Sequence, residues 1–295
     1  MLVVIAGPTA VGKSDLAVEL AEKINGEIVS ADSMQIYKGF DIGTAKITQD
    51  EMKGIPHYMI DVTSKDAPFS VSDYKNMAKP IIDDILKRGK TPILVGGTGL
   101  YIDAILHPFQ FGGYDETVRQ KYNDMLASIG KEALYEILKQ KAPDKANKIH
   151  PNNTKRVVRA LETAEVGGGN SDDKVKNEYD YIYIVLKMDR EALYNRVNKR
   201  VDKMIDLGLC DEVARLKDIY PWECQAMQAI GYKEWREYFL GRDTLENVKE
   251  KIKLNSRHYV KRQLTWFRAK SEAVWFDASK KDEIIEYVAN KMKGN

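Results

Sequence analysis

The 295-residue chain lacks the features that mark several specialised classes of protein. Its only cysteines, Cys210 and Cys224, have neither CxxC spacing nor a histidine cluster nearby, which argues against a disulfide framework and a structural zinc site. It has no run of about 18 apolar residues, so we expect no membrane span. No basic segment precedes the apolar first six residues, so a secretory signal is not expected either. These absences predict a cytoplasmic protein.

The chain also lacks a strong charge imbalance, because 46 Lys and Arg residues stand against 44 Asp and Glu residues. A formal net charge of +2 does not by itself indicate a nucleic-acid-binding protein, so any basic surface must be local. Seven cations and no acid lie within residues 251–270: Lys251, Lys253, Arg257, Lys261, Arg262, Arg268 and Lys270. The aromatic residues among them recur at helical spacing, which favours core contacts over base stacking.

Short apolar runs at residues 2–6, 27–30, 92–95 and 181–186 alternate with helical patterns. This alternation predicts an α/β fold of the P-loop NTPase type, a parallel sheet flanked by helices. Amphipathic helices are expected within residues 190–220 and 245–267, and one late strand at 273–276.

Residues 114–165 carry a helical pattern without any strand signal, which predicts a helical insertion. Seven apolar positions are its candidate core: Leu126, Leu134, Ile137, Leu138, Val157, Val158 and Leu161. The GGGNSDD segment from Gly167 to Asp173 has the composition of a flexible connector. We therefore expect a P-loop core at residues 1–113, the insertion at 114–175, and completion of the core with basic helices at 176–295.

The segment GPTAVGKS matches the phosphate-binding pattern GxxxxGKS and lies between a predicted strand and a predicted helix, as that motif requires. Its glycines allow successive amides to turn inward, and the helix N-terminus adds a favourable dipole. Lys13 is expected to reach the outer phosphate oxygens, and the Ser14 hydroxyl to bind Mg²⁺. The predicted phosphate site comprises Gly7, Pro8, Thr9, Ala10, Val11, Gly12, Lys13 and Ser14.

Phosphate binding does not select a reaction. The guanine-reading NKxD pattern is absent, because residues 198–202 miss its spacing by one and are interpreted as a solvated helix face. No acid follows the strands that end near residues 95 and 186, so a Walker-B site for ATP hydrolysis is not expected. With GTPase and ATPase activity disfavoured, the sequence indicates a transferase or a kinase.

A second group of polar residues follows the second and third strands. Asp32 comes directly after a strand, so it should lie at the same sheet edge as the phosphate loop and could take a proton from a nucleophile. Gln35 could read a base edge, and Thr98 in the GGTG turn could donate to a leaving oxygen. On the residues alone, Asp32 could instead cap a helix, and GGTG could be a purely structural turn.

These segments together resemble the tRNA dimethylallyltransferase family. The resemblance rests on motifs in the family's order over nearly the whole chain: GPTAVGKS, ADSMQIY, DIGTAK, GIPHYMID, ILVGGTGLYI, RVVRALE, QAIGYKE and SRHYVKRQLTWF. It implies a Mg²⁺-dependent transfer of a dimethylallyl group from dimethylallyl diphosphate to the exocyclic amine of the adenine 3′ of the anticodon. The partner is then the anticodon stem-loop of tRNA, and the enzyme is expected to be a monomer.

The resemblance also assigns roles to residues. Asp32 is implied as the general base, Thr98 and Lys13 as catalytic groups on the diphosphate side, and Arg200 as a further diphosphate ligand. The implied tRNA contacts are Asp32, Ser33, Met34, Gln35, Thr98, Arg119, Lys155, Arg156, Val157, Val158, Arg159, Gly231 and Tyr232. On a predicted helix, Arg156 and Arg159 are three residues apart, which suits a clamp on the RNA backbone.

Two departures and three alternatives accompany this interpretation. The GGGNSDD connector replaces a longer polar segment, and the zinc finger of eukaryotic members is absent, which fits a bacterial type of enzyme. One alternative is an adenylate isopentenyltransferase that uses the same donor on free AMP, ADP or ATP. Another is a small-molecule kinase in which the loop holds ATP. The third is an RNA-binding protein with a vestigial phosphate loop.

Overall fold

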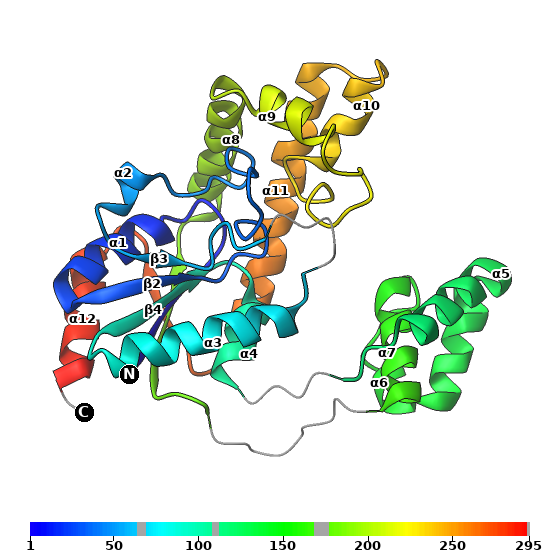
Figure 1. The fold of residues 1–295 in the computed structure, drawn as a ribbon, viewed down its shortest axis with the longest axis horizontal. Helices are drawn as coiled ribbons and strands as arrows, with labels where there is room; N and C mark the ends of the chain where they lie inside the picture. The colour runs from blue at the N-terminus through cyan, green and yellow to red at the C-terminus, as the bar shows by residue number, and fades with distance from the viewer. Residues whose placement is uncertain (64–68, 108–111, 168–176, 294–295) are drawn as a thin grey trace. The chain divides into compact units, whose positions relative to one another are not determined.

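The computed structural model describes residues 1–63, 69–107, 112–167 and 177–293, which divide into two compact units (Figure 1). The core unit comprises Met1–Leu106 and Asn177–Asn295, and the insertion unit comprises His107–Lys176. None of the described helices is both long and apolar enough to cross a membrane.

The described strands of the core unit form one parallel six-stranded sheet in the order β3-β2-β4-β1-β5-β6. The strands are β1 (Leu2–Ala6), β2 (Gly26–Ser30), β3 (His57–Tyr58), β4 (Thr91–Gly96), β5 (Tyr181–Lys187) and β6 (Val274–Asp277). The α/β prediction is confirmed, and β3 is an addition because two residues leave no readable pattern. Ala6 pairs with Gly96 and with Val185, so β1, β4 and β5 end together at one edge.

Helices cover both faces of this sheet, which explains why its central strands are apolar on both sides. One face packs on α1 (Lys13–Ile24) and α12 (Lys281–Lys293), and the other on α3 (Val71–Lys87) and α4 (Gly99–Leu106) (Figure 1). The expected amphipathic helices are present as α8 (Arg190–Asp206), α9 (Leu209–Leu216) and α11 (Leu245–Arg268). Three short helices complete the unit: α2 (Gln49–Met52), η1 (Lys233–Trp235) and α10 (Arg236–Phe239).

The insertion unit is helical, as predicted, with α5 (Glu116–Lys141), α6 (Pro143–Ala146) and α7 (Thr154–Val166). Five of the seven expected core positions are buried, whereas Leu126 and Ile137 are half-buried. Val157 and Val158 are 1% and 4% exposed, so the tRNA contact predicted at these residues would have to involve their backbone. They pack in the core of this unit. The GGGNSDD connector lies outside the described residues except for Gly167.

Candidate active site

The phosphate loop turns from the end of β1 into the start of α1. Gly7 has φ +147°, and a side chain there would place its Cβ 2.9 Å from the Leu186 carbonyl oxygen, so only glycine fits beside β5. Gly12 caps α1 in the left-handed region, with φ +101°. These two positions let the loop bend around a ligand at the helix N-terminus, which is the geometry of an anion site.

Lys13 lies at the first position of α1 and folds back over the loop. Its Nζ donates to the Pro8 carbonyl oxygen over 2.7 Å. Burial lowers the pKa of Lys13 to about 7, while the charge of Asp32 raises it and that of Arg200 lowers it further. An anion bound here would favour the charged ammonium, so diphosphate binding and protonation of Lys13 are coupled.

A cavity of about 460 Å³ adjoins the loop and is strongly basic on one side. Four cations at helical spacing on α8 line it, namely Arg196, Lys199, Arg200 and Lys203, opposite Lys13 and Ser14. Within residues 198–202, which were interpreted as a solvated face, Lys199 is exposed as expected, whereas Arg200 is half-buried and Val201 is buried. A diphosphate suits this concentration of positive charge.

The loop also offers a place for Mg²⁺. The Ser14 side chain is exposed and lines the same cavity as Lys13. Mg²⁺ keeps several waters and commonly takes one or two protein oxygens together with substrate phosphates, so a single hydroxyl beside a diphosphate cavity fits it. Within the described ranges, no group of three or more His, Cys, Asp or Glu residues could hold a metal.

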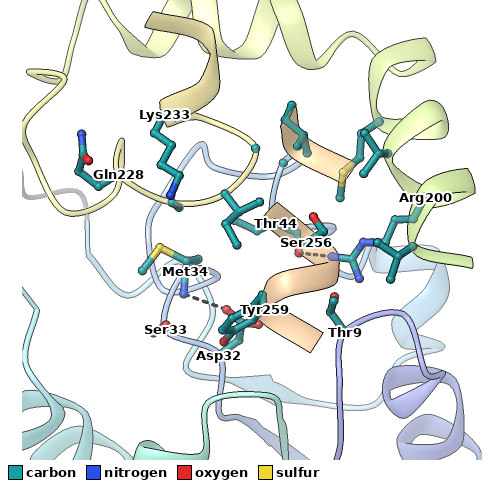
Figure 2. A pocket seen from close by; sticks show the side chains of 18 of the residues that line it. Thr9, Asp32, Ser33, Met34, Thr44, Arg200, Gln228, Lys233, Ser256 and Tyr259 are labelled. Carbon is teal, nitrogen blue, oxygen red and sulfur yellow. Dashed lines mark hydrogen bonds between the residues drawn. The ribbon is translucent and has the colours of Figure 1, made fainter. Parts of the chain in front are cut away.

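Asp32 follows β2 and faces a second cavity of about 300 Å³ (Figure 2). Its Oδ1 accepts hydrogen bonds from the backbone amides of Met34 at 2.9 Å and Gln35 at 3.4 Å. The residues after it form a turn and not a helix, so the alternative of a helix cap is wrong. No described residue donates to Oδ2, which leaves that oxygen available to a ligand.

Thr98 lies beside Asp32, as expected from the alignment of strand ends. Its amide donates to the Ala31 carbonyl oxygen over 3.1 Å, and its hydroxyl accepts from the Ser33 amide over 3.1 Å. Tyr259 of α11 lines the same cavity as Asp32, and burial with the charge of Asp32 raises the pKa of Tyr259 to about 12. Tyr259 is therefore a neutral phenol at the wall of the cavity.

Gln263 connects the phosphate loop to the GGTG turn, and the sequence analysis did not single it out. The side chain is buried, its Oε1 accepts from the Thr9 amide over 2.9 Å, and its Nε2 donates to the Gly97 carbonyl oxygen over 3.0 Å. One amide thus fixes two loops that approach the same ligand. The signal was present in the sequence as a polar residue at an apolar helical position, between Val260 and Phe267.

The DIGTAK loop forms another wall and is held by a buried carboxylate that the sequence analysis missed. Glu212 of α9 accepts from the backbone amides of Asp41, Ile42 and Gly43 over 2.8–3.1 Å. It also accepts from the Tyr232 hydroxyl over 2.7 Å. Tyr232 is fully buried, whereas Gly231 lines the cavity, so within this predicted pair of tRNA contacts Gly231 is the accessible residue.

The anchored loop in turn positions two predicted site residues. Arg200 donates to the Thr44 carbonyl oxygen over 3.1 Å, and burial lowers its pKa while Asp32 opposes that shift (Figure 2). Gln35 donates weakly to the Thr44 and Ala45 carbonyl oxygens at 3.5 and 3.4 Å. Its amide is thus oriented by backbone before any base arrives.

The 300 Å³ cavity has one polar and one apolar side. Thr9, Asp32, Arg200 and Tyr259 contribute polar groups, and Figure 2 places them around one end. Apolar residues of α8 and α11 form the other side, namely Val197, Val201, Met204 and Ile252. Arg200 lines both this cavity and the basic one, so the two adjoin at its guanidinium. The arrangement suits an apolar group joined to a diphosphate, next to a carboxylate that can accept a proton.

The other predicted tRNA contacts lie in the insertion unit, where two of the charged side chains are ion-paired and two are not. Arg119 and Arg159 both pair with Glu162, which is fully buried, at 2.9 and 2.8 Å. Burial acts to raise the pKa of Glu162, but hydrogen bonds from Arg159 and Arg119 outweigh it and hold that pKa below its usual value. Lys155 and Arg156 are exposed, and neither forms an ion pair with a described residue.

The parallel sheet, the phosphate loop at its carboxyl edge and the carboxylate facing the adjoining cavity define a P-loop transferase. A family model described as IPP transferase matches residues 35–270. A tRNA dimethylallyltransferase of Halalkalibacterium halodurans is 45% identical, covering 99% of this chain and 98% of its own length. One of Bacillus cytotoxicus is 48% identical, covering 99% and 96%. The chain belongs to the IPP transferase family.

Solved structures agree with this assignment. The tRNA isopentenylpyrophosphate transferase of Bacillus halodurans matches with a TM-score of 0.76 at 46% identity, covering 99% of this chain and 97% of that one. A eukaryotic dimethylallyltransferase acting on tRNA matches with a TM-score of 0.79 at 31% identity, covering 94% and 73%. The predicted family and fold are confirmed.

Proposed function

We propose that the chain transfers the dimethylallyl group of dimethylallyl diphosphate to the exocyclic amine of the adenine 3′ of the anticodon in tRNA, with release of diphosphate. One observation carries the proposal: Asp32, whose Oδ2 accepts no hydrogen bond from a described residue, lines a cavity that adjoins the basic phosphate cavity at Arg200. A carboxylate base and a diphosphate site thereby meet at one point.

The residues divide the reaction between them. An adenine amine is a weak nucleophile because its lone pair is delocalised into the ring, so removal of its proton by Asp32 assists formation of the carbon–nitrogen bond. Charge develops on the departing diphosphate, and the loop amides, Lys13, Arg200 and the Thr98 hydroxyl stabilise it. Mg²⁺ on Ser14 would add Lewis-acid stabilisation of the same oxygens.

The cavity walls supply orientation. The apolar side formed by Val197, Val201, Met204 and Ile252 suits the dimethylallyl carbons. Met34 and Gly231 line the cavity and Gln35 follows Met34 in the turn after Asp32, so we assign these residues to the acceptor side, where a base taken out of the anticodon stack would be seated. The role of Gln263 is to keep the phosphate loop and the Thr98 turn in register, so that donor and acceptor meet in line.

The rest of the assignment follows from the acceptor. Because tRNA is a cytoplasmic substrate, we place the enzyme in the cytoplasm, and we expect it to act as a monomer. Residues 1–113 and 176–295 supply the chemistry and a basic surface, and residues 114–175 supply further tRNA contacts through Lys155 and Arg156.

Mass spectrometry of nucleosides tests this function. Unmodified tRNA is incubated with enzyme, Mg²⁺ and dimethylallyl diphosphate, digested, and compared with a reaction that lacks the donor. We expect an adenosine heavier by one dimethylallyl group at the position 3′ of the anticodon. Absence of that nucleoside, with phosphoryl transfer from ATP to a small molecule instead, would favour the kinase alternative.

A further inference from the structure

The basic segment at residues 251–270 separates into two groups once its partners are known. Lys251 pairs with Asp243, Lys253 with Asp202 and Glu250, and Lys270 with Asp103. Arg257 donates to the Asn198 side chain, and Arg262 stacks over the Tyr259 ring at the active site. Of the seven cations, only Lys261 and Arg268 make neither an ion pair, a side-chain hydrogen bond nor a ring contact with any residue of the described ranges.

These two free cations lie on one face of α11. Lys261 and Arg268 are seven residues apart, so they are stacked two turns from each other. Tyr259, Gln263 and the cavity-lining Ile252 and Ser256 occupy a different face, which looks into the active site. One face of α11 therefore lines the active site, and another face carries two cations without an ion-pair partner among the described residues.

The face with the free cations lines a groove of about 590 Å³, here called the α8–α11 groove. Lys187 at the end of β5 and Arg190 at the start of α8 line it as well, and neither is ion-paired with a described residue. All four cations are exposed. None of the described residues that line the groove is an Asp or a Glu.

The nearest acids offset this charge only in part: hydrogen bonds from Ser279 and, to a smaller extent, the charge of Lys187 lower the pKa of Asp277. Asp277, which pairs in register with Lys187, accepts from the amide and hydroxyl of Ser279 at 2.9 and 2.6 Å. Asp189 caps α8 by accepting from the amides of Glu191 and Ala192. The groove therefore carries four exposed cations and no carboxylate among its described lining residues, a local excess of positive charge that suits an anionic partner.

We propose that the α8–α11 groove binds the phosphate backbone of the tRNA substrate. Charges drawn from β5, α8 and α11 are spread along an open groove, and an extended polyanion matches that spread better than a single small anion. The proposal rests on tRNA being the acceptor. It adds a contact surface in the core unit that is separate from the acceptor cavity and from the predicted contacts of the insertion.

Salt dependence of RNA binding tests the groove with a matched control. Affinity for an anticodon stem-loop is measured by fluorescence anisotropy from 50 to 300 mM salt, roughly the range where counterion release dominates. The groove variant is Lys261→Gln/Arg268→Gln. The control is Lys251→Gln/Lys253→Gln, which removes the same charges from the same helix at positions whose cations are already paired.

Each neutralised phosphate contributes about −0.7 to −0.9 to the log–log slope, so the groove variant should show a slope shallower by roughly 1.4–1.8. The control should retain most of the wild-type slope. An unchanged slope in the groove variant, or equal flattening in the control, would overturn the proposal. Wild-type enzyme that neither binds the stem-loop nor modifies it would instead count against the proposed function.

Discussion

Charged residues serve opposite purposes in the core unit and in the insertion unit. In the core unit, Asp32 and Arg200 are held by backbone groups, so their charges remain available to a ligand. In the insertion unit, Arg119 and Arg159 are held by the buried carboxylate of Glu162, which balances one of their two charges and fixes both side chains. Residue type alone does not separate these cases, because the partner decides what a charge can still do.

The same difference in partners separates the roles of Arg156 and Arg159, which lie three residues apart on α7. Arg159 also donates to the carbonyl oxygens of Gly112 and Gly113 at 2.9 and 3.1 Å, which ties α7 to the start of the unit. The Arg156 side chain makes no such contact with a described residue. We therefore expect Arg159 to maintain the insertion and Arg156 to meet the RNA, in place of a clamp made by both.

The largest effect is expected where a free charge performs chemistry. Asp32→Asn keeps the Oδ1 acceptor for Met34 and Gln35 but removes the base, so kcat should fall by about 10²–10⁴. Affinity for the stem-loop should change little, because the turn is retained. Single-turnover kinetics with saturating RNA measure the rate, and turnover within threefold of wild type would remove Asp32 from the base role.

The next largest effect is expected for Lys13→Met, which should lower kcat by about 10²–10³ because the ammonium no longer stabilises the departing diphosphate. Its pKa of about 7 adds a pH signature. Below pH 7 the free enzyme already carries the ammonium that the diphosphate needs, and above pH 7 that proton must be acquired on binding. Calorimetry should show that donor affinity weakens from pH 6 to 8, and that it weakens more in wild-type enzyme than in Lys13→Met. The donor titrates equally in both experiments, so the difference between the two pH profiles reports Lys13 alone. Parallel pH profiles would contradict the coupling.

In the insertion unit the effect should be on stability. Arg159→Ala leaves fully buried Glu162 with one cation fewer, which costs about 1–3 kcal/mol, whereas Arg156→Ala at an exposed site should stay within about 0.5 kcal/mol. Urea denaturation of both variants measures the difference. Because the pKa of Glu162 is depressed in the fold, its contribution is present at neutral pH and is lost as the pH falls into the acid range. Equal stability of the two variants would mean that Arg159 is not structural.

The smallest effect is expected for RNA binding by a single exposed cation. Arg156→Gln should make the log–log salt slope of stem-loop binding shallower by roughly 0.7. Lys145→Gln, which removes a cation from α6 of the same unit, is the control and should leave the slope nearly unchanged. A slope that responds to neither substitution would place the RNA away from α7.

The fold and the phosphate loop could be read from the sequence because each rests on local pattern. Apolar runs such as residues 2–6 are specified by burial on both sheet faces, and GPTAVGKS carries its own geometry. The sequence does not reveal which residues far apart in the chain contact each other in the fold. Glu212 lies about 170 positions from the loop that it anchors, and Gln263 lies 254 positions from Thr9. Tyr232 and Val157 likewise fit a motif while packing in a core, and only tertiary contacts show that.

The central claim is that a polynucleotide, and not a free nucleotide, is the acceptor. An anticodon stem-loop with an accessible adenine and AMP are offered together to the enzyme with labelled dimethylallyl diphosphate, and the two products are quantified. Contacts outside the reaction centre orient the base only in the stem-loop, so we predict that it is preferred by at least ~10-fold in kcat/KM. Equal or greater use of AMP would contradict the claim and favour the adenylate isopentenyltransferase.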